Sequence, residues 1–457
     1  MEKKDLTIII FGGTGDLAGR KLIPALFDLY TNKLLPNNLR IVGFGRKDLS
    51  NKVYREFVKQ SLSKKRDAGK NKFINNFSYH RGDLTNEQDY RHLAEYLGTM
   101  DFRSGVCSNK LFHLAVPPEL YEPVFKNLSK SGMTLPCISS EENKKYWTRV
   151  LVEKPFGKDL KQAIALDKLL GKSFMENQIF RIDHYLAKET VQNILTFRFA
   201  NTIFEPVWTS KHIKSVNIRL YENIDINKRG ASYDPVGELR DMGQSHILQL
   251  LALVAMEDPG EFNADKIQSS RALVLSQTKP NFQEPIIRGQ YIGYKKELNV
   301  KHNSDTETYF KLALNVNNKR FKDVPFYIES GKALDEKKTE IEIVFDNDKN
   351  QTNKIIFSIQ PDEKITIQFW VKKTGFNYKL NEKNLTFHYN EEDAYLHDAY
   401  EKVLYDCVRG DQTLFPSTAE VLAQWRIITP ILEYWKSVPL KKYKKGIKSE
   451  FIIKNKK

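Results

Sequence analysis

Short apolar runs alternate with amphipathic segments along the first part of the chain. The first run, Leu6 to Phe11, ends in a glycine-rich turn, and the apolar positions Leu22, Leu26 and Leu29 that follow have helical spacing. The same alternation continues, with further strands expected at 39–44, 77–80, 110–116, 149–153 and 178–182, and helices at 50–62, 117–128 and 160–170. Strands that alternate with helices predict a parallel, doubly wound sheet.

The pattern changes after residue 182. One helical stretch is followed by segments in which apolar and polar residues alternate, as in Ile341-Glu342-Ile343, and this period of two predicts an antiparallel sheet with one exposed face. Its strands are expected at 213–221, 309–316, 341–345, 354–359 and 365–371, and the helices covering it at 239–256, 391–408 and 418–435. We therefore expect a Rossmann-like α/β domain over 1–182 and an α+β domain with a large, mainly antiparallel sheet over 183–457.

The length of the chain agrees with a division into two domains, and its net charge indicates which classes of partner it could bind. The chain has 457 residues, more than one hydrophobic core usually supports, and its 72 Lys and Arg against 57 Asp and Glu give a net charge of +15. Such a surplus suits nucleic acid or small phosphorylated substrates. The basic clusters at 64–72 and 441–457 lack aromatic stacking platforms, so we expect solvated surface there and no nucleic-acid partner.

The cysteines and the start of the chain bear on location. Cys107, Cys137 and Cys407 form neither a C-x-x-C pair nor an even-numbered framework, which predicts unpaired cysteines in a reducing compartment and no metal site. The apolar run near the start is too short for a signal peptide or a membrane span. We expect a cytoplasmic protein with no membrane partner.

The first strand leads into a turn typical of dinucleotide-binding proteins. Residues 12–18 read Gly-Gly-Thr-Gly-Asp-Leu-Ala, a G-x-x-G-x-x-A variant whose small residues, Gly12, Gly13 and Gly15, allow close approach of a pyrophosphate. An ordinary glycine-rich turn is the alternative. At the end of the second strand, where NAD-binding proteins carry an acid, the chain has Arg46, which favours NADP because a guanidinium can clamp a 2′-phosphate.

A carboxylate, an imidazole, a phenol and an ammonium fall close together at Asp183, His184, Tyr185 and Lys188. A helix through 181–189 would place His184 and Lys188 on one face, and its free N–H groups would help to hold a phosphate. Asp183 would be repelled by that anion and left for another cation. The alternative is a charged, solvated first turn.

Lys154 follows the fifth predicted strand and precedes Pro155, so we expect it at the carboxyl edge of the sheet, where ligands of this fold bind. The alternative is an ordinary turn lysine, and the isomer of the Lys154–Pro155 bond stays open.

His246 lies where the segment 240–248 changes from polar to apolar. An imidazole is well suited to take a proton near neutral pH, and a carboxylate such as Asp183 would orient it and stabilise its charged form. The alternative is a buried structural histidine.

Together, these motifs resemble the glucose-6-phosphate dehydrogenase family over nearly the whole chain. The matching stretches are those at 12–18, Glu-Lys-Pro-Phe-Gly at 153–157, Arg-Ile-Asp-His-Tyr-Leu-Ala-Lys-Glu at 181–189, and those at 198–201, 241–246, 330–334, 360–363 and 425–430. The resemblance implies NADP-dependent oxidation of glucose 6-phosphate at C1 to 6-phosphogluconolactone, the first step of the oxidative pentose phosphate pathway. It also implies a homodimer, or a dimer of dimers, built through the large sheet. NAD stays open as a second cofactor.

The resemblance also implies roles for individual residues. His246 would be the base and Asp183 its partner, and Lys154 would lie between sugar and nicotinamide. Substrate would be held at the phosphate and at the sugar by His184, Tyr185, Lys188, Glu222, Asp241, Lys332, Lys337 and Gln360. Cofactor contacts would come from Thr14, Asp16, Leu17, Arg46 and Asp83.

Three places depart from the family pattern, and two other functions stay open. Ser245 stands where asparagine is common, and Ala231 and Ser232 replace part of a small-residue turn. Lys337 stands where arginine is frequent in some members, with loss of bidentate geometry. The alternatives are a non-catalytic NADP-binding regulator with the same fold and another two-domain sugar oxidoreductase.

Overall fold

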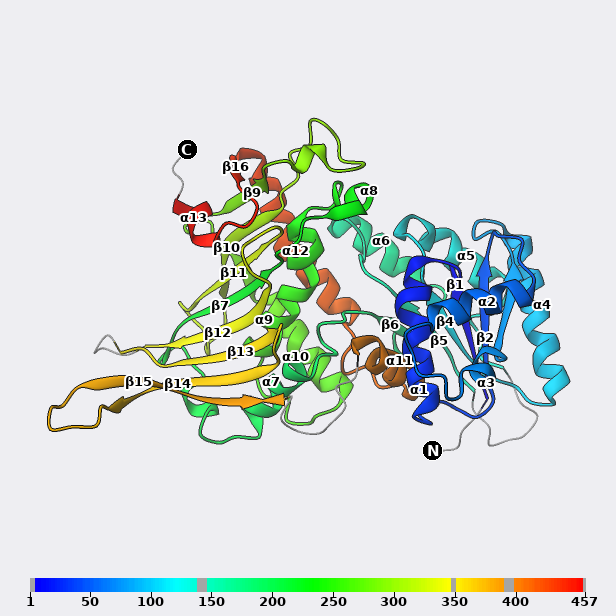
Figure 1. Cartoon of the computed structure of the whole chain (residues 1–457), viewed down its shortest axis with the longest axis horizontal. Helices are drawn as coiled ribbons and strands as arrows, with labels where there is room; N and C mark the ends of the chain where they lie inside the picture. The colour runs from blue at the N-terminus through cyan, green and yellow to red at the C-terminus, as the bar shows by residue number, and fades with distance from the viewer. Residues whose placement is uncertain (1–4, 138–145, 347–350, 390–397, 455–457) are drawn as a thin grey trace. The chain divides into compact units, whose positions relative to one another are not determined.

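The computed structural model of the chain describes residues 5–137, 146–346, 351–389 and 398–454 (Figure 1). The chain forms two compact units. The first contains Met1–Gly157, Lys161–Ala187 and His397–Thr418, and the second contains Lys158–Leu160, Lys188–Leu396 and Ala419–Lys457.

The first unit is built on a six-stranded sheet in the order β3-β2-β1-β4-β5-β6. All of its neighbouring strands are parallel, as expected for a doubly wound sheet. The strands are β1 (Leu6–Phe11), β2 (Leu39–Gly45), β3 (Phe77–Arg81), β4 (Asn109–Leu114), β5 (Thr148–Val152) and β6 (Ile179–Arg181). Every residue of β1 is buried, which explains why this strand is a continuous apolar run.

Helices connect these strands. They are the π-helix η1 (Ala18–Leu22), α1 (Ile23–Thr31), α2 (Asn51–Ser61), α3 (Lys70–Ile74), α4 (Glu87–Ser104), α5 (Tyr121–Lys130) and α6 (Leu160–Gly171). The helix α4 was not expected from the sequence, although the Asn86 side chain accepts a hydrogen bond from the Gln88 N–H at its start and Gly105, at φ +70°, ends it.

One helix lies in a different unit from the one expected. The segment 391–408 was expected to cover the sheet of the second domain, but α11 (Ala399–Arg409) belongs to the first unit. Its Val403, Leu404 and Cys407 join the hydrophobic core that contains Ile8. Residues 391–397 lie outside the described part of the chain.

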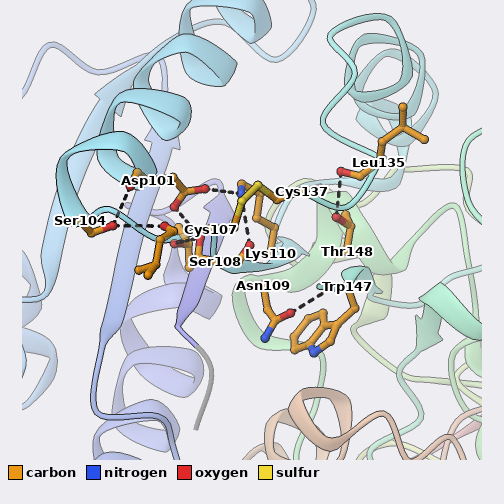
Figure 2. The surroundings of a disulfide bond; sticks show 12 residues. Asp101, Ser104, Cys107, Ser108, Asn109, Lys110, Leu135, Cys137, Trp147 and Thr148 are labelled. Carbon is orange, nitrogen blue, oxygen red and sulfur yellow. Dashed lines mark hydrogen bonds and ion pairs between the residues drawn. A yellow bond between two sulfur atoms is a disulfide. The ribbon is translucent and has the colours of Figure 1, made fainter. Parts of the chain in front are cut away.

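A disulfide bond joins Cys107, in the loop before β4, to Cys137, in the segment after α5 (Figure 2). Their Cα atoms are 6.0 Å apart. Cys407 is a free, buried thiol. The expectation of three unpaired cysteines is therefore wrong for two of them, because the parallel sheet brings together two loops that are distant in sequence.

The second unit is built on a ten-stranded sheet in the order β15-β14-β13-β12-β7-β11-β10-β9-β16, with β8 paired to β10. Its strands are β7 (Ile213–Tyr221), β8 (Thr278–Pro280), β9 (Ile287–Tyr291), β10 (Tyr309–Val316), β11 (Pro325–Gly331), β12 (Lys338–Phe345), β13 (Lys354–Gln360), β14 (Lys364–Lys372), β15 (Leu380–His388) and β16 (Leu440–Tyr443). The pairs β7–β11 and β9–β16 are parallel and the others antiparallel, so the expected mainly antiparallel sheet is confirmed.

Helices lie alongside this sheet (Figure 1). They include α7 (Glu189–Phe199), the π-helix η6 (Leu239–Ile247), which continues into α9 (Leu248–Ala255), α10 (Ala264–Ser276) and α12 (Thr418–Tyr434). Among the described residues, no helix combines the length and apolarity needed to cross a lipid bilayer.

Candidate active site

The glycine-rich turn after β1 requires its glycines. Gly12 has φ +80°, and a Cβ atom added there would lie 2.4 Å from the carbonyl oxygen of Ala115. A Cβ added to Gly13 would lie 2.6 Å from the Cα of Gly43, in β2. The Gly12 and Gly13 N–H groups both donate to the carbonyl of Phe44, at 2.9 and 3.3 Å. The turn is thus held close against the neighbouring strands, as a pyrophosphate-binding turn must be.

Arg46 and Asp83 follow β2 and β3, which pair in parallel up to Gly45 and Arg81. The carboxylate of Asp83 accepts hydrogen bonds from the N–H and hydroxyl of Thr85, and these bonds, with a smaller contribution from the Arg46 charge, lower the pKa of Asp83. Arg46 itself is exposed. The two predicted cofactor contacts therefore lie close enough to interact, at the edge that also carries the glycine-rich turn.

The other predicted cofactor residues lie in the same turn. Thr14 is half-buried, whereas Asp16 is exposed and forms a surface ion pair with Arg20, at 2.8 Å. Leu17 directly precedes η1 and is half-buried.

Lys154 follows β5, at the same carboxyl edge of the sheet. The Lys154–Pro155 bond is cis, which resolves the alternative that the sequence left open. Lys154 is half-buried.

Asp183 follows β6, and its side chain is almost fully buried, with 1% of its surface exposed. Its Oδ1 accepts a hydrogen bond from the N–H of Tyr185 at 3.0 Å, and its carbonyl accepts one from Leu186 at 3.1 Å. These bonds close a turn, so the expected helix through 181–189 is wrong and His184 and Lys188 do not share a helix face. The rings of His184 and Tyr185 are 5.0 Å apart.

Lys188 is the residue that precedes α7, and it belongs to the second unit. At the start of this helix, the N–H and hydroxyl of Thr190 donate to Glu363 Oε2, at 3.0 and 2.8 Å. Glu363 lies in the turn between β13 and β14, close in sequence to Gln360. The start of α7 is thereby tied to the strand end that carries another predicted substrate residue.

Four predicted substrate residues lie at one end of the large sheet. Glu222 follows β7, Lys332 follows β11, Lys337 precedes β12 and Gln360 ends β13. The strand register explains this, because β11 and β12 pair Gly331 and Lys338 with Tyr221, and β13 pairs Gln360 with Thr339. Lys337 is exposed, whereas Lys332 has only 1% of its surface exposed.

Lys332 lies among three carboxylates. Its Nζ is hydrogen-bonded to Glu222 and lies 3.4 Å from Asp241 Oδ2 and 3.5 Å from Glu238 Oε2. Burial alone would lower the pKa of Lys332, but the negative charges of Glu238, Asp241 and Glu222 raise it above its usual value. Lys332 is therefore a fixed ammonium group at neutral pH.

The backbone around Lys332 is held firmly. Its N–H donates to the Thr308 carbonyl and its own carbonyl accepts from the Tyr443 hydroxyl, both at 2.8 Å. The next residue, Ala333, has φ +53°, a conformation that side chains with a Cβ rarely adopt and that is often found at functional sites.

Asp241 and His246 both lie on η6, where hydrogen bonds join residues five apart instead of four. This winding brings these two residues to the same side of the helix, whereas α-helical spacing would separate them. His246 has 1% of its surface exposed, and Asp241 also lies 3.4 Å from Arg229.

Glu238 and Arg229 also belong to this cluster, and neither was expected from the sequence. Glu238 directly precedes η6 and is fully buried. An acid before a helix is an ordinary helix-start residue, so no signal in the sequence distinguishes it. The catalytic pair proposed from the sequence joins Asp183 of the first unit to His246 of the second, and that pairing remains a prediction.

Comparison with known proteins identifies the family. The model of the glucose-6-phosphate dehydrogenase NAD-binding domain matches residues 9–193, and that of the C-terminal domain of glucose-6-phosphate dehydrogenase matches residues 195–450. The chain belongs to the glucose-6-phosphate dehydrogenase family. The family, the fold class and the enzyme class expected from the sequence, an oxidoreductase, are confirmed.

Individual relatives support this assignment. The glucose-6-phosphate 1-dehydrogenase of Chlamydia muridarum is 37% identical, across 94% of this chain and 90% of that protein. The enzyme of Bacillus subtilis is 38% identical, across 94% and 91%. A solved glucose-6-phosphate dehydrogenase in complex with glucose 6-phosphate superposes with a TM-score of 0.91 at 32% identity, covering 99% of this chain and 98% of that one. A levoglucosan dehydrogenase, at 12% identity and a TM-score of 0.53, shares the fold alone.

Proposed function

We propose that this enzyme oxidises glucose 6-phosphate at C1 with NADP, giving 6-phosphogluconolactone. The observation that carries the proposal is the convergence, at one end of the large sheet, of Glu222, Lys332, Lys337 and Gln360. Carboxylates and a fixed ammonium are the groups that hydrogen-bond sugar hydroxyls. Asp241, on the same helix as His246, adds a carboxylate to this set.

In the proposed reaction, His246 takes the proton of the C1 hydroxyl while C1 loses a hydride and becomes the lactone carbonyl. NADP, when bound, accepts that hydride. Asp183 stabilises the imidazolium that forms, and Lys154 holds the sugar and the nicotinamide in contact. A positioned base contributes about 10²–10⁴-fold to such a step, and the remainder comes from orientation of the two reactants.

The phosphate is the proposed handle for that orientation. His184, Tyr185 and Lys188 are assigned to it, and binding energy gained there helps to place C1 against the nicotinamide. Unphosphorylated glucose should therefore lose turnover as well as affinity.

The cofactor assignment rests on the edge of the parallel sheet. Gly12 and Gly13 lack the Cβ atoms that would collide with the backbone of Ala115 and Gly43, so the turn can keep the close packing that is typical of a pyrophosphate-binding turn. Arg46 is proposed to bind the 2′-phosphate, with Asp83 nearby, and NAD is proposed as a weaker second cofactor.

The decisive test is a spectrophotometric assay of cofactor reduction. We expect reduction of NADP, and slower reduction of NAD, that depends on glucose 6-phosphate. No reduction with any sugar would favour a non-catalytic NADP-binding regulator. Equal rates with glucose and glucose 6-phosphate would favour another sugar oxidoreductase.

For domain organisation and assembly we propose residues 1–182, together with α11, as the NADP-binding domain, and the remainder of residues 183–457 as the domain that binds substrate and forms a homodimer, or a dimer of dimers. The edge strand β15 and the loop before it expose large apolar side chains, among them Phe376, Tyr378 and Leu385. Exposed apolar groups on an edge strand suit pairing with a second copy. Light scattering coupled to size-exclusion chromatography should give a dimer mass, and Leu385→Lys should shift it toward the monomer.

The cytoplasmic location stays a prediction. The cysteine argument behind it fails for Cys107 and Cys137, which are disulfide-linked. Fractionation of the source cells with an antibody against the protein would test it.

A further inference from the structure

Glu238 is fully buried and lies directly before η6, the helix that carries Asp241 and His246. Each of its carboxylate oxygens has a hydroxyl partner. The Tyr233 hydroxyl donates to Oε2 at 2.7 Å, and the Ser330 hydroxyl donates to Oε1 at 2.6 Å. The carboxylate is therefore held in one orientation by two other elements, α8 (Gly230–Tyr233) and β11.

The third neighbour of this carboxylate is Lys332, whose Nζ lies 3.5 Å from Glu238 Oε2. Lys332 comes two residues after Ser330, so Glu238 contacts both the end of β11 and the ammonium that follows it. Through its own backbone it is also joined to the start of η6. Glu238 thus links the strand end that presents Lys332 to the helix that presents Asp241.

The other two carboxylates around Lys332 differ from Glu238 in exposure. One third of the Glu222 side chain and 16% of the Asp241 side chain are accessible, so both can turn to sugar hydroxyls. The Glu238 side chain has no accessible surface and both of its carboxylate oxygens already accept hydrogen bonds from hydroxyl groups, so we assign it no contact with the sugar. Among the proposed substrate groups, Lys332 is the one whose positive charge attracts the Glu238 carboxylate, at 3.5 Å, whereas Asp241 and Glu222 repel it. A buried ammonium without such a partner is strongly disfavoured.

We propose that Glu238 is a positioning residue for the reaction, which fixes the ammonium of Lys332 in the direction of the sugar while Glu222 and Asp241 bind hydroxyls. This inference rests on the proposed function, in which Lys332 contacts the substrate.

Glu307, in the same region, provides a matched control for the possibility that Glu238 has a purely structural role. Glu307 is also buried, its Oε1 accepts a hydrogen bond from the Leu239 N–H at 3.0 Å, and a Cβ at Gly237 would clash with its carboxylate. Glu307 therefore holds the start of η6 through the backbone. If Glu238 did only this, Glu238→Gln and Glu307→Gln would have the same consequences.

Steady-state kinetics on Glu238→Gln, Lys332→Ala and the double variant test the proposal. We expect Glu238→Gln to lower kcat/KM for glucose 6-phosphate by about ten- to a hundredfold, the usual effect of losing a hydrogen bond to a charged group, and to leave KM for NADP within about twofold. In the Lys332→Ala background, Glu238→Gln should have almost no further effect, because the group through which it acts is gone. Glu307→Gln should instead have the same effect in both backgrounds.

Additive losses from Glu238→Gln and Lys332→Ala would overturn the positioning role while leaving the proposed function intact. Normal kinetics of Lys332→Ala would mean that Lys332 does not contact the sugar, so the proposed substrate site and the inference would both fail. If Glu238→Gln does not fold, as judged by circular dichroism and thermal unfolding, Ser330→Ala replaces it. That variant removes one hydroxyl partner of the Glu238 carboxylate, together with the contact of that hydroxyl with the Leu220 carbonyl. It should cost a few-fold in kcat/KM, and the part that acts through Glu238 should appear only when Lys332 is present.

The pH profile adds a measurement that a structural role would not change. Burial raises the pKa of Glu238, the ammonium of Lys332 and the hydrogen bond from Ser330 oppose this, and Asp241 and Glu222 reinforce it. Tyr233 supplies the second hydroxyl partner, and the charge of Glu238 in turn raises the pKa of nearby Glu307. If Glu238 must be ionised to position Lys332, then activity requires that Glu238, as well as the catalytic base, has lost its proton. The acid-side slope of log(kcat/KM) against pH should then be smaller by about one in Glu238→Gln than in the wild type. Parallel acid limbs would contradict the proposal.

Discussion

His113 Nε2 lies 3.6 Å from Oε1 of Glu153, at the ends of the neighbouring parallel strands β4 and β5. The His113 side chain is almost fully buried, and although 15% of Glu153 is exposed, its Oε1 is not. Burial lowers the pKa of His113 to about 3 and raises that of Glu153 to about 7. Near neutral pH, much of this contact is therefore between two uncharged groups.

Glu153 should make stability depend on pH. Its pKa rises from 4.5 in the unfolded chain to about 7 in the folded protein. As the pH increases through this window, the unfolded state releases a proton that the folded state retains, so the free energy of unfolding falls, and above the folded pKa it no longer changes. The effect of this one group is at most about 3 kcal/mol. We expect Glu153→Gln to flatten the change in urea midpoint between pH 5 and pH 8, and parallel changes in both proteins would contradict the pKa assignment.

The strands of the first unit could be predicted because a buried strand is visible in the sequence as a run of apolar residues. All six residues of β1 are buried, and a continuous apolar run that ends in glycine has few other interpretations. The strand β15 could not be predicted in the same way. Eight of its nine residues are exposed, so neither face requires apolar side chains and no alternation appears. For α11, the helical pattern was visible, but the core in which Cys407 is buried was not.

The sequence could predict which residues belong to the site, but not how they are arranged in space. The turn at Asp183 was mistaken for a helix because His184 and Lys188 have helical spacing, whereas the Asp183 side chain bonds the Tyr185 N–H and favours a turn. Glu238 and Lys332 are far apart in the sequence, and they meet only because η6 packs against β11 in the folded unit.

Arg46→Ala should weaken NADP binding and spare NAD. One charged contact to the 2′-phosphate is typically worth about 1.5–3 kcal/mol, so KM for NADP should rise by roughly ten- to a hundredfold. Arg46→Lys keeps the charge but loses the bidentate geometry, and it should lie between the wild type and the alanine variant. Steady-state kinetics with NADP and with NAD would compare the wild type with the two variants. Equal losses with NADP and NAD would show that Arg46 does not bind the 2′-phosphate.

Lys188→Ala should mainly raise KM for glucose 6-phosphate, by about tenfold or more, because an ammonium partner of the phosphate is lost. Lys214, exposed near the start of β7, is a suitable control. It lies eight residues before Glu222, roughly 26 Å along an extended strand, so Lys214→Ala removes the same charge far from the proposed site. An unchanged KM in Lys188→Ala would mean that Lys188 does not bind the phosphate and that the phosphate site lies elsewhere.

His246→Asn should lower kcat by about 10²–10⁴-fold, because asparagine keeps a polar side chain of similar size but cannot take the proton from the C1 hydroxyl. Substrate binding should survive, since Lys332 and Asp241 are unchanged, and stabilisation of the variant by glucose 6-phosphate in thermal unfolding would measure it. His302, an exposed histidine in the same unit, provides a control position for the same substitution. His302→Asn should leave both kcat and thermal stabilisation unaltered. Near-normal turnover of His246→Asn would mean that another group is the base, and loss of stabilisation together with turnover would make His246 a binding residue.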